Sequence, residues 1–326
     1  MAELNTAASL VLTHTTDGIS GDYSPSAFPE DYFEFELSSF TAFLLLFGFL
    51  MILIIFLCGL VGNAIVIYYL CFILKKNPIT TYILNLAVAD ACVLLSVVVL
   101  YSSLKESDPN SLSSISPYLL FYTYTTSGYL LTAISVEKCL SVVFPIWYRC
   151  HRPEHMSAIV CALIWAMSSL FFGIDSFLIY SSIKFLVIST ISSVFCPLLV
   201  LICTVILFTK VCCSLHRRQR GKFYTALLLA LLFFIIFGVP FSAMMTLIGF
   251  EVIDIKSIVW GPLICMTCAV INSSVNPFLY FLIGRGKKHR PREPLKVVLE
   301  RVFVDKADCR EDQSPQAMTA SMMMTS

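Results

Sequence analysis

Seven stretches of the chain are apolar over a length that matches the thickness of a lipid bilayer. The hydrocarbon core of a membrane is about 30 Å thick, and an α-helix needs about 20 mostly apolar residues to cross it. The predicted spans lie roughly at residues 43–72, 79–103, 116–143, 157–177, 185–213, 223–249 and 257–283. The pattern therefore predicts an all-α membrane protein, a bundle of seven transmembrane helices.

The count of seven depends on residues 157–211, which are apolar almost throughout. This stretch could be counted as one helix or as two. Two spans joined by a very short turn near Asp175 to Lys184 fit its length best.

Lysine and arginine gather on one side of the predicted bundle. Residues 1–40 contain acidic residues but no lysine or arginine. Most basic residues follow spans one, three, five and seven: Lys75, Lys76, Arg149, Arg152, Arg217, Arg218, Arg220, Lys222, Arg285, Lys287, Lys288, Arg290 and Arg292. Because basic loops stay on the cytosolic side of a membrane, we expect the N-terminus to be extracellular.

Three domains follow from this topology. Residues 1–40 are predicted to form a disordered acidic extracellular tail, and residues 41–284 the seven-helix transmembrane domain. Residues 285–326 are predicted to form a cytosolic tail, with a short amphipathic helix followed by a disordered end.

Composition supports a membrane protein and narrows its function. Hydrophobic residues make up 58% of the chain and charged residues only 13%, whereas about a quarter of a soluble protein is charged. Basic residues do not interleave with aromatic residues as a nucleic-acid surface requires. The sequence also lacks the His-Glu-x-x-His pattern and the paired membrane aspartates of intramembrane enzymes, so we do not expect an enzyme.

Several polar residues fall inside the predicted spans, where they cannot face lipid. Asp90 in span two is the clearest case. Others at comparable depth are Asn63, Ser127, Asn272, Ser273 and Asn276. Together they could surround a small cation with oxygen ligands or form a hydrogen-bonded network without an ion, and both interpretations stay open.

Short motifs in three spans resemble those of rhodopsin-like receptors. They are Gly59-Leu-Val-Gly-Asn63, Asn85-Leu-Ala-Val-Ala-Asp90 and Asn276-Pro-Phe-Leu-Tyr280, in this order. The longer segment from Leu130 to Pro153 resembles the Mas-related receptor family more specifically. The resemblance covers about Gly59 to Phe303. It implies a rhodopsin-like, multi-pass receptor of the plasma membrane that is activated by a ligand and acts on a heterotrimeric G protein.

The resemblance also assigns roles to individual residues. The family's sodium-site positions correspond to Asp90, Ser127, Asn272, Ser273 and Asn276, and sodium is the only ion or cofactor that we expect. The G-protein-facing motif corresponds to Glu137, Lys138 and Cys139, and Tyr280 corresponds to the tyrosine that moves inward on activation.

The resemblance further suggests where a ligand binds. Asp175 matches an acidic position that pairs with cationic ligands in several Mas-related receptors, so we expect a peptide or an amine-bearing ligand there. The alternative is that Asp175 is a solvated loop acid. Four aromatic residues could line the ligand cavity or simply pack in the bundle: Tyr101, Tyr124, Phe241 and Trp260.

Several residues depart from the usual receptor pattern. Lys138 stands where most rhodopsin-like receptors have an arginine, and lysine lacks the planar fork of arginine. Gly238 replaces a large aromatic residue, and Val205 a tyrosine. Pro291 and Pro294 are expected to interrupt the amphipathic helix after span seven. We therefore expect a receptor that couples weakly or unusually.

Two other functions remain open on the sequence. A receptor-shaped decoy or scaffold would bind its ligand without activating a G protein, and Lys138 favours that alternative. A transporter is less consistent with the sequence, because Asp90 is the only deep charge and no inverted repeat is detectable. Arrestin and receptor kinases are further expected partners, since the tail carries Ser314, Thr319, Ser321, Thr325 and Ser326.

Overall fold

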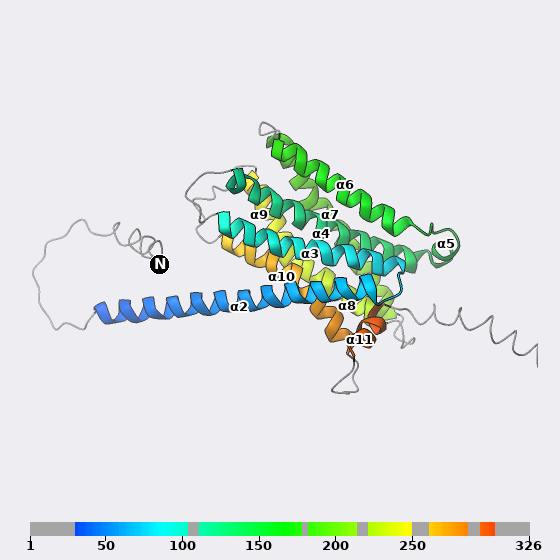
Figure 1. Cartoon of the computed structure of the whole chain (residues 1–326), viewed down its shortest axis with the longest axis horizontal. Helices are drawn as coiled ribbons and strands as arrows, with labels where there is room; N and C mark the ends of the chain where they lie inside the picture. Colours follow the sequence, from blue (N-terminus) through cyan, green and yellow to red (C-terminus); the bar gives the residue numbers. More distant parts are fainter. Residues whose placement is uncertain are drawn as a thin grey trace, which may run out of the picture. The chain divides into compact units, whose positions relative to one another are not determined.

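The computed structural model describes residues 30–103, 111–177, 182–213, 221–249, 261–285 and 294–303. All regular elements in these ranges are helices (Figure 1). They are α2 (Glu30–Phe72), α3 (Pro78–Ser103), α4 (Ser111–Val143), α5 (Pro145–Cys150), α6 (Met156–Phe177), α7 (Ser182–Cys213), α8 (Gly221–Phe233), η1 (Phe234–Gly238), α9 (Val239–Gly249), α10 (Gly261–Gly284) and α11 (Leu295–Phe303). The chain divides into two compact units, residues 1–49 and Leu50–Ser326, and the bundle belongs to the second.

The predicted spans correspond to these helices. Spans two to five match α3, α4, α6 and α7 closely, and span six is built from α8, η1 and α9 in succession. The first span lies within α2, which begins earlier than expected, at Glu30. The last span lies in α10, which begins at Gly261 because residues 250–260 are outside the described ranges.

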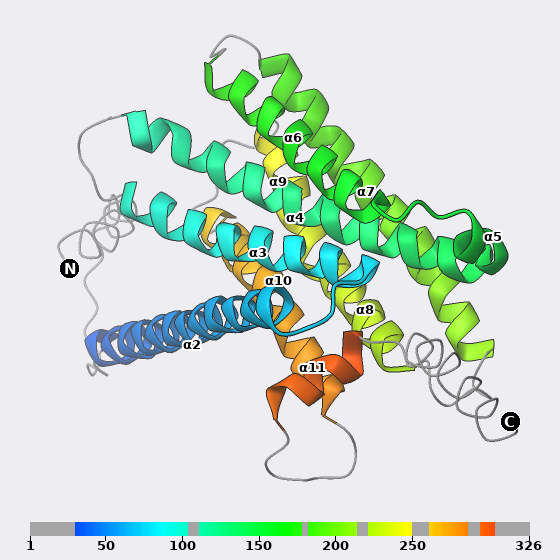
Figure 2. The ribbon, with the colours of Figure 1, turned by 45° about the vertical axis from the view of Figure 1, so that its right-hand side comes forward.

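Four of the described helices are long and apolar enough by themselves to cross a membrane. They are Thr41–Phe72, Pro78–Ser103, Tyr224–Met244 and Met266–Gly284, and Met156–Leu170 and Val194–Lys210 are shorter apolar helices. Helix α4 is less apolar because it lies inside the bundle, packed against α3, α6 and α7 (Figures 1 and 2). Several of its buried hydroxyls bond to carbonyls of their own helix, as Thr126 does to Tyr122 O (2.8 Å) and Thr132 to Gly128 O (2.7 Å), so these hydroxyls need no water.

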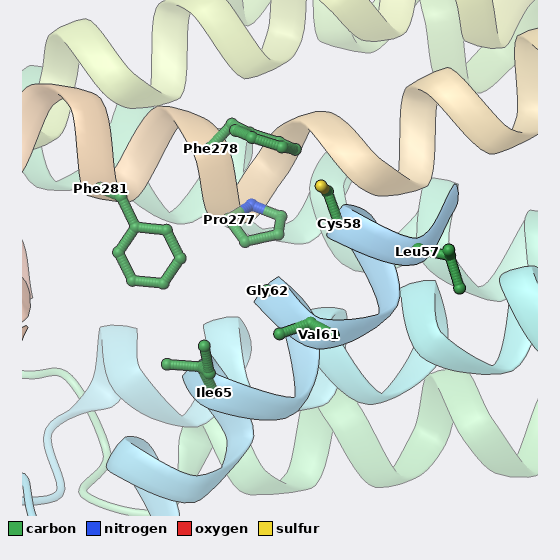
Figure 3. A pocket seen from close by; sticks show the side chains of 8 residues that line it. All are labelled: Leu57, Cys58, Val61, Gly62, Ile65, Pro277, Phe278 and Phe281. Atoms are coloured by element: carbon green, nitrogen blue, oxygen red, sulfur yellow. The ribbon is translucent and has the colours of Figure 1, made fainter. Parts of the chain in front are cut away.

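Helices α2 and α10 approach closely at two glycines. A Cβ atom on Gly59 would lie 2.1 Å from Ser274 Oγ, and one on Gly62 would lie 2.9 Å from Pro277 Cβ. Small residues let the backbones of two membrane helices come together, which explains why glycine occupies these positions. Beside this contact lies an apolar cavity of about 320 Å³, lined by Leu57, Cys58, Val61, Gly62, Ile65, Pro277, Phe278 and Phe281 (Figure 3).

The sixth span contains a π-helical turn, η1, directly before Pro240. Proline has no backbone N–H, so the regular helical bonding must be interrupted around it. Here the Val239 N–H bonds to Phe234 O, and such π-turns often mark functional positions. A Cβ atom on Gly238 would lie 2.7 Å from Phe234 Cδ2 and 2.9 Å from Tyr124 Oη. Glycine replaces the aromatic residue because its neighbours already fill the space.

The helix that the structure describes after span seven is α11, which starts at Leu295, immediately after Pro294. Pro291 lies outside the described ranges, so its expected interruption of a helix after Gly284 stays a prediction. Proline is tolerated at the start of a helix, where its missing N–H has no helical partner. The Pro294 carbonyl accepts hydrogen bonds from Val297 N (3.0 Å) and Val298 N (3.3 Å). We call the end of the bundle that carries Glu137, α5 and α11 the Glu137 end.

Candidate functional site

Asp90 is completely buried in α3 and receives hydrogen bonds from two neighbouring helices. Ser127 of α4 donates to Asp90 Oδ1 at 2.6 Å, and Asn276 of α10 donates through its Nδ2 to Asp90 Oδ2 at 2.8 Å. Hydrogen bonds to both oxygens offset part of the cost of removing a carboxylate from water. The carboxyl group thus joins three helices at the centre of the bundle.

Two further members of the predicted polar group lie on the same part of α10. Ser273 is fully buried near the Asp90 carboxyl group, and its hydroxyl makes no hydrogen bond of normal geometry within the described ranges. Asn272 is also buried, but no described hydrogen bond joins it to Asp90. Asn63 ties α2 to α10, because its Nδ2 donates to Gly59 O and to Ser273 O, both at 3.0 Å.

This group of residues has the oxygens that a small hard cation needs. These oxygens belong to the Asp90 carboxyl group and to the hydroxyls of Ser127 and Ser273. Because the buried Ser273 hydroxyl has no hydrogen bond of normal geometry within the described chain, it has a lone pair available for an ion. The residues therefore fit a sodium ion, and they also form a coherent network without one.

At the Glu137 end, the Glu137 carboxylate lies at the centre of a second buried cluster. Arg152 Nε bonds to Glu137 Oε1 at 2.7 Å, and the side chains of Glu137 and Arg152 are 3% and 7% exposed. The Tyr148 hydroxyl donates to the same oxygen at 2.6 Å. Arg152 also donates through Nη2 to Ser157 Oγ on α6. The cluster therefore links α4, α5 and α6 through one carboxylate.

Tyr148 is held in its neutral form within this cluster. Burial, followed by the hydrogen bond and the negative charge of Glu137, raises the pKa of Tyr148 above its ordinary value. The guanidinium of Arg152, 5.4 Å from the centre of the Tyr148 ring, acts in the opposite direction. Tyr148 therefore remains a hydrogen-bond donor to Glu137 throughout the physiological pH range.

The other two residues of the predicted G-protein-facing motif contact different helices. The ammonium group of Lys138 lies 5.7 Å from the centre of the Tyr224 ring on α8, and Lys138 is buried. Cys139 is buried against α7, with its Sγ 3.4 Å from Cys203 O. Lys138 could have paired with Glu137, but the described ion pair of Glu137 is with Arg152. The motif thus connects α4 with α5, α6, α7 and α8.

Tyr280 lies near the same end on α10 and is buried. Its ring meets the Phe303 ring of α11 edge to face, with centroids 5.1 Å apart. Val205, which stands where many rhodopsin-like receptors have a tyrosine, is exposed on the outside of α7. Within the described ranges, the aromatic partner of Tyr280 therefore comes from the C-terminal helix.

The candidate ligand residues are only partly brought together. Tyr124 and Phe241 are buried and pack on each other, with ring centroids 4.2 Å apart, which matches the packing interpretation. Tyr101 is exposed on α3. Asp175 lies in the last turn of α6, but its side chain is outside the described structure, as is the whole of Trp260.

Sequence reasoning missed three residues of the Glu137 cluster: Tyr148, Arg152 and Ser157. Arg152 was counted only as a charge that sets the membrane orientation. A usable signal was present, because a buried acid at the end of a span needs a cationic partner. The position of that partner depends on how α5 folds back towards α6.

Comparison with known proteins identifies relatives over most of the chain. The profile of the rhodopsin family of seven-transmembrane receptors matches residues 62–184. The mouse protein "Proto-oncogene Mas" is 38% identical over 277 residues, covering 78% of this chain and 83% of that protein. The rat "Mas-related G-protein coupled receptor member H" is 38% identical over 267 residues, covering 78% and 82%. The human "Mas-related G-protein coupled receptor member X1" is 34% identical over 274 residues, covering 79% and 83%.

Proposed function

Because this chain belongs to the Mas-related family of rhodopsin-type G-protein-coupled receptors, we propose that it binds a peptide or another cationic ligand outside the cell and activates a heterotrimeric G protein. Membership of this family makes the protein a multi-pass receptor of the plasma membrane and not an enzyme. It also removes the transporter alternative. What we propose beyond family membership is the class of ligand, the orientation of the protein in the membrane and the activation of a G protein.

The observation that carries the coupling proposal is the arrangement of Glu137 and Lys138. Glu137 is tied to Arg152 and Tyr148, while the neighbouring Lys138 is buried against Tyr224 of α8. A change in the separation of α4 and α8 would release the Lys138 ammonium from the ring. We propose that this release exposes the surface that the G protein contacts.

A second feature at the same end supports a protein partner. Ile146 of α5 is 79% exposed, and Phe144 and Trp147 beside it are also exposed. Exposed apolar side chains next to a polar cluster are typical of protein interfaces. We propose that Ile146 contacts the G protein, and that Arg152 and Tyr148 hold α5 in position for this contact.

For the ligand, Asp175 remains the proposed anchor. It lies in the last turn of α6, and that turn contains no basic residue. An acid at a helix C-terminus is disfavoured by the helix dipole, so a cationic ligand group would relieve an unfavourable charge. We propose that a lysine, an arginine or an amine of the ligand pairs with Asp175.

Two further elements of the proposal concern regulation. Sodium would be held by Asp90, Ser127 and Ser273, with Asn276 orienting the carboxylate, and would favour the resting arrangement of α3, α4 and α10. Kinases and arrestin would act on Ser314, Thr319, Ser321, Thr325 and Ser326, which lie outside the described residues.

The experiment is a G-protein dissociation assay in cells with basic peptides as trial agonists, run across a panel of G-protein subtypes. It compares the wild-type receptor with Lys138→Arg and Asp175→Asn, with Glu154→Gln as a control for removal of an acid elsewhere. We expect Asp175→Asn to lower agonist potency by about tenfold or more, because a charge pair is lost, and Glu154→Gln to leave it unchanged. Equal potency of Asp175→Asn and wild type would contradict the anchor.

The same assay separates a coupling receptor from a decoy. The decoy alternative is favoured by one observation, the burial of a lysine rather than an arginine against Tyr224. We expect the wild type to signal and Lys138→Arg to signal more strongly, because arginine contacts partners through a planar fork. If the wild type is silent at normal surface expression and only Lys138→Arg signals, the natural protein is a decoy.

A further inference from the structure

The C-terminal helix α11 is docked on the Glu137 end by one complete face. Its buried side chains are Val298, Leu299, Val302 and Phe303. The opposite face is polar, with Lys296 and Glu300 exposed and 3.8 Å apart. An amphipathic helix of this kind is held by its apolar face and not by internal helix propensity, since nine residues are too few for a stable isolated helix.

The surface under α11 is built from four separate parts of the bundle. Buried residues that pack in the same cluster come from α2 and the turn after it (Val66, Leu70, Leu74), from α3 (Ile79, Ile83, Ala87), from α8 (Ala226) and from α10 (Tyr280). Asn77, just before α3, donates through Nδ2 to Phe303 O at 3.1 Å. Figures 1 and 2 both show α11 at the end of α10, close to α8.

The docking of α11 is specific at both of its ends. At the start, Val298 fills a space next to Gly284, where a Cβ atom would lie 2.6 Å from Val298 Cγ1 and 2.6 Å from its carbonyl oxygen. At the other end, the Phe303 ring covers Tyr280. Glycine at position 284 therefore permits the close approach, and the aromatic contact completes it.

We propose that α11 is an intramolecular inhibitor that occupies part of the G-protein site and holds α8 against α10 until it is displaced. This proposal rests on the proposed coupling function and adds its regulation. Helix α11 contacts both α10 and α8, so these helices cannot separate at this end without breaking the packing of Leu299 and its neighbours. A G protein that approaches Tyr280 or Ala226 meets α11 first. At this end, α8 is contacted both by α11 and, through the Tyr224 ring, by Lys138 of α4.

Once displaced, α11 can bury its apolar face elsewhere, at the membrane surface. Its apolar face requires cover once it leaves the bundle, and its exposed face carries charge. An amphipathic helix with these two faces can lie in the interface of a bilayer. Burial of the apolar face in the bilayer therefore offsets part of the free energy that is lost when α11 leaves the bundle. The helix can then exchange between a docked state and a membrane-bound state.

The first test measures docking without any signalling. Val302→Cys and Val297→Cys are introduced singly into the full-length receptor, and their reaction with a membrane-impermeant maleimide is followed in permeabilised cells by mass spectrometry. Val302 is 4% exposed and Val297 39% exposed on the same helix. We expect Val302→Cys to react at least tenfold more slowly, and to approach the rate of Val297→Cys when Leu299→Gln is added. Equal rates in the two single variants would overturn the docking.

The second test measures inhibition by G-protein dissociation in cells. Leu299→Gln places a polar group in a fully buried position, whereas Val297→Gln makes the matched change on the exposed face. We expect Leu299→Gln to raise basal activity severalfold and Val297→Gln to leave it at the wild-type level. If Leu299→Gln does not reach the cell surface, Leu299→Ala and Phe303→Ala replace it in the assay and are compared with the wild type at equal surface expression.

The outcomes distinguish the inhibitor from the coupling on which it rests. If labelling shows release of α11 but neither basal nor agonist-stimulated activity rises, the inhibitory role is overturned. If no variant activates any G protein with any basic peptide, the coupling is contradicted together with the inhibition. The labelling rates still decide in that case whether α11 is docked.

Discussion

At the scale of single residues, two buried carboxylates organise the protein in different ways. Asp90 is bonded by neutral donors, the hydroxyl of Ser127 and the amide of Asn276, and no lysine or arginine of the described ranges forms an ion pair with it. Glu137 has its own cation, Arg152. A buried acid paired with a fixed arginine is a structural unit, whereas a buried acid bonded only by neutral groups can respond to an ion.

The pairing of Glu137 with Arg152 leads to a stability prediction. Arg152→Gln leaves a buried carboxylate without its cation, which we expect to cost about 3 kcal/mol of unfolding free energy. Lys296→Gln breaks the exposed ion pair with Glu300 and should cost less than about 0.5 kcal/mol. The measurement is the thermal unfolding of the purified receptor in detergent. Similar effects of the two variants would show that the Glu137 cluster is not buried in solution.

The environment of Asp90 leads to a prediction about sodium. A bound ion stabilises the folded receptor in proportion to the logarithm of its concentration above the Kd. We expect sodium chloride to raise the melting temperature relative to choline chloride at equal ionic strength, and Asp90→Asn to abolish this difference. Ser96→Ala is the control, because Ser96 is a buried hydroxyl of α3 that bonds to Thr123 instead. A sodium effect that survives in Asp90→Asn would place the ion elsewhere.

At the scale of elements, the sixth span illustrates how a departure from the receptor pattern is accommodated. The π-turn η1, Pro240 and Gly238 form a single local arrangement, in which Phe234 and Tyr124 occupy the volume next to Gly238. A larger residue at position 238 would clash with these two rings in their present positions. The span therefore differs from the usual pattern in its packing and not only in one residue.

Gly238→Ala tests this packing. The added methyl group would overlap Phe234 and Tyr124, so we expect a loss of about 1–3 kcal/mol in unfolding free energy. Gly173→Ala is a matched change in α6, where no atom lies within 4 Å of the added Cβ, and helix propensity alone should make it neutral or slightly stabilising. Both are measured by thermal unfolding, and an equal response at the two positions would contradict the close packing around Gly238.

At the scale of the whole molecule, the two ends of the bundle differ in chemistry. The Glu137 end contains the Arg152 cluster, the exposed side chains of α5 and the docked α11. Lysine and arginine are also concentrated in the segments that connect helices at this end. Because basic loops are retained in the cytosol, the Glu137 end is expected to face the G protein.

This orientation can be measured directly on cells. An epitope tag before Met1 should be stained by antibody on intact cells, whereas a tag after Ser326 should be stained only after permeabilisation. This orientation is expected because residues 1–40 contain no lysine or arginine, whereas both are abundant after span seven. The reverse staining pattern would invert the assignment of ligand and G-protein sides.

Features that depend on local composition could be predicted from the amino-acid sequence. Apolar length predicted spans that lie in α2, α3, α4, α6, α7, the α8–α9 segment and α10, because a helix that crosses lipid must be apolar over a known distance. Asp90, Ser127 and Asn276 could be grouped in advance, because deep polar side chains cannot face lipid and must meet one another. Family membership was likewise predicted from short motifs and is confirmed by the relatives.

The groups that meet at the Glu137 end, by contrast, are distant in the sequence and could be identified only in the folded chain. Arg152 pairs with Glu137 because the connection that contains α5 returns the chain to the end of α4, and Lys138 contacts the Tyr224 ring on α8. The side chains around Gly238, and the contact of Phe303 with Tyr280, likewise join residues far apart in the chain. Such contacts depend on the path of the connecting segments and on the shape of the packed surfaces, and no local pattern of hydrophobic and polar positions contains that information.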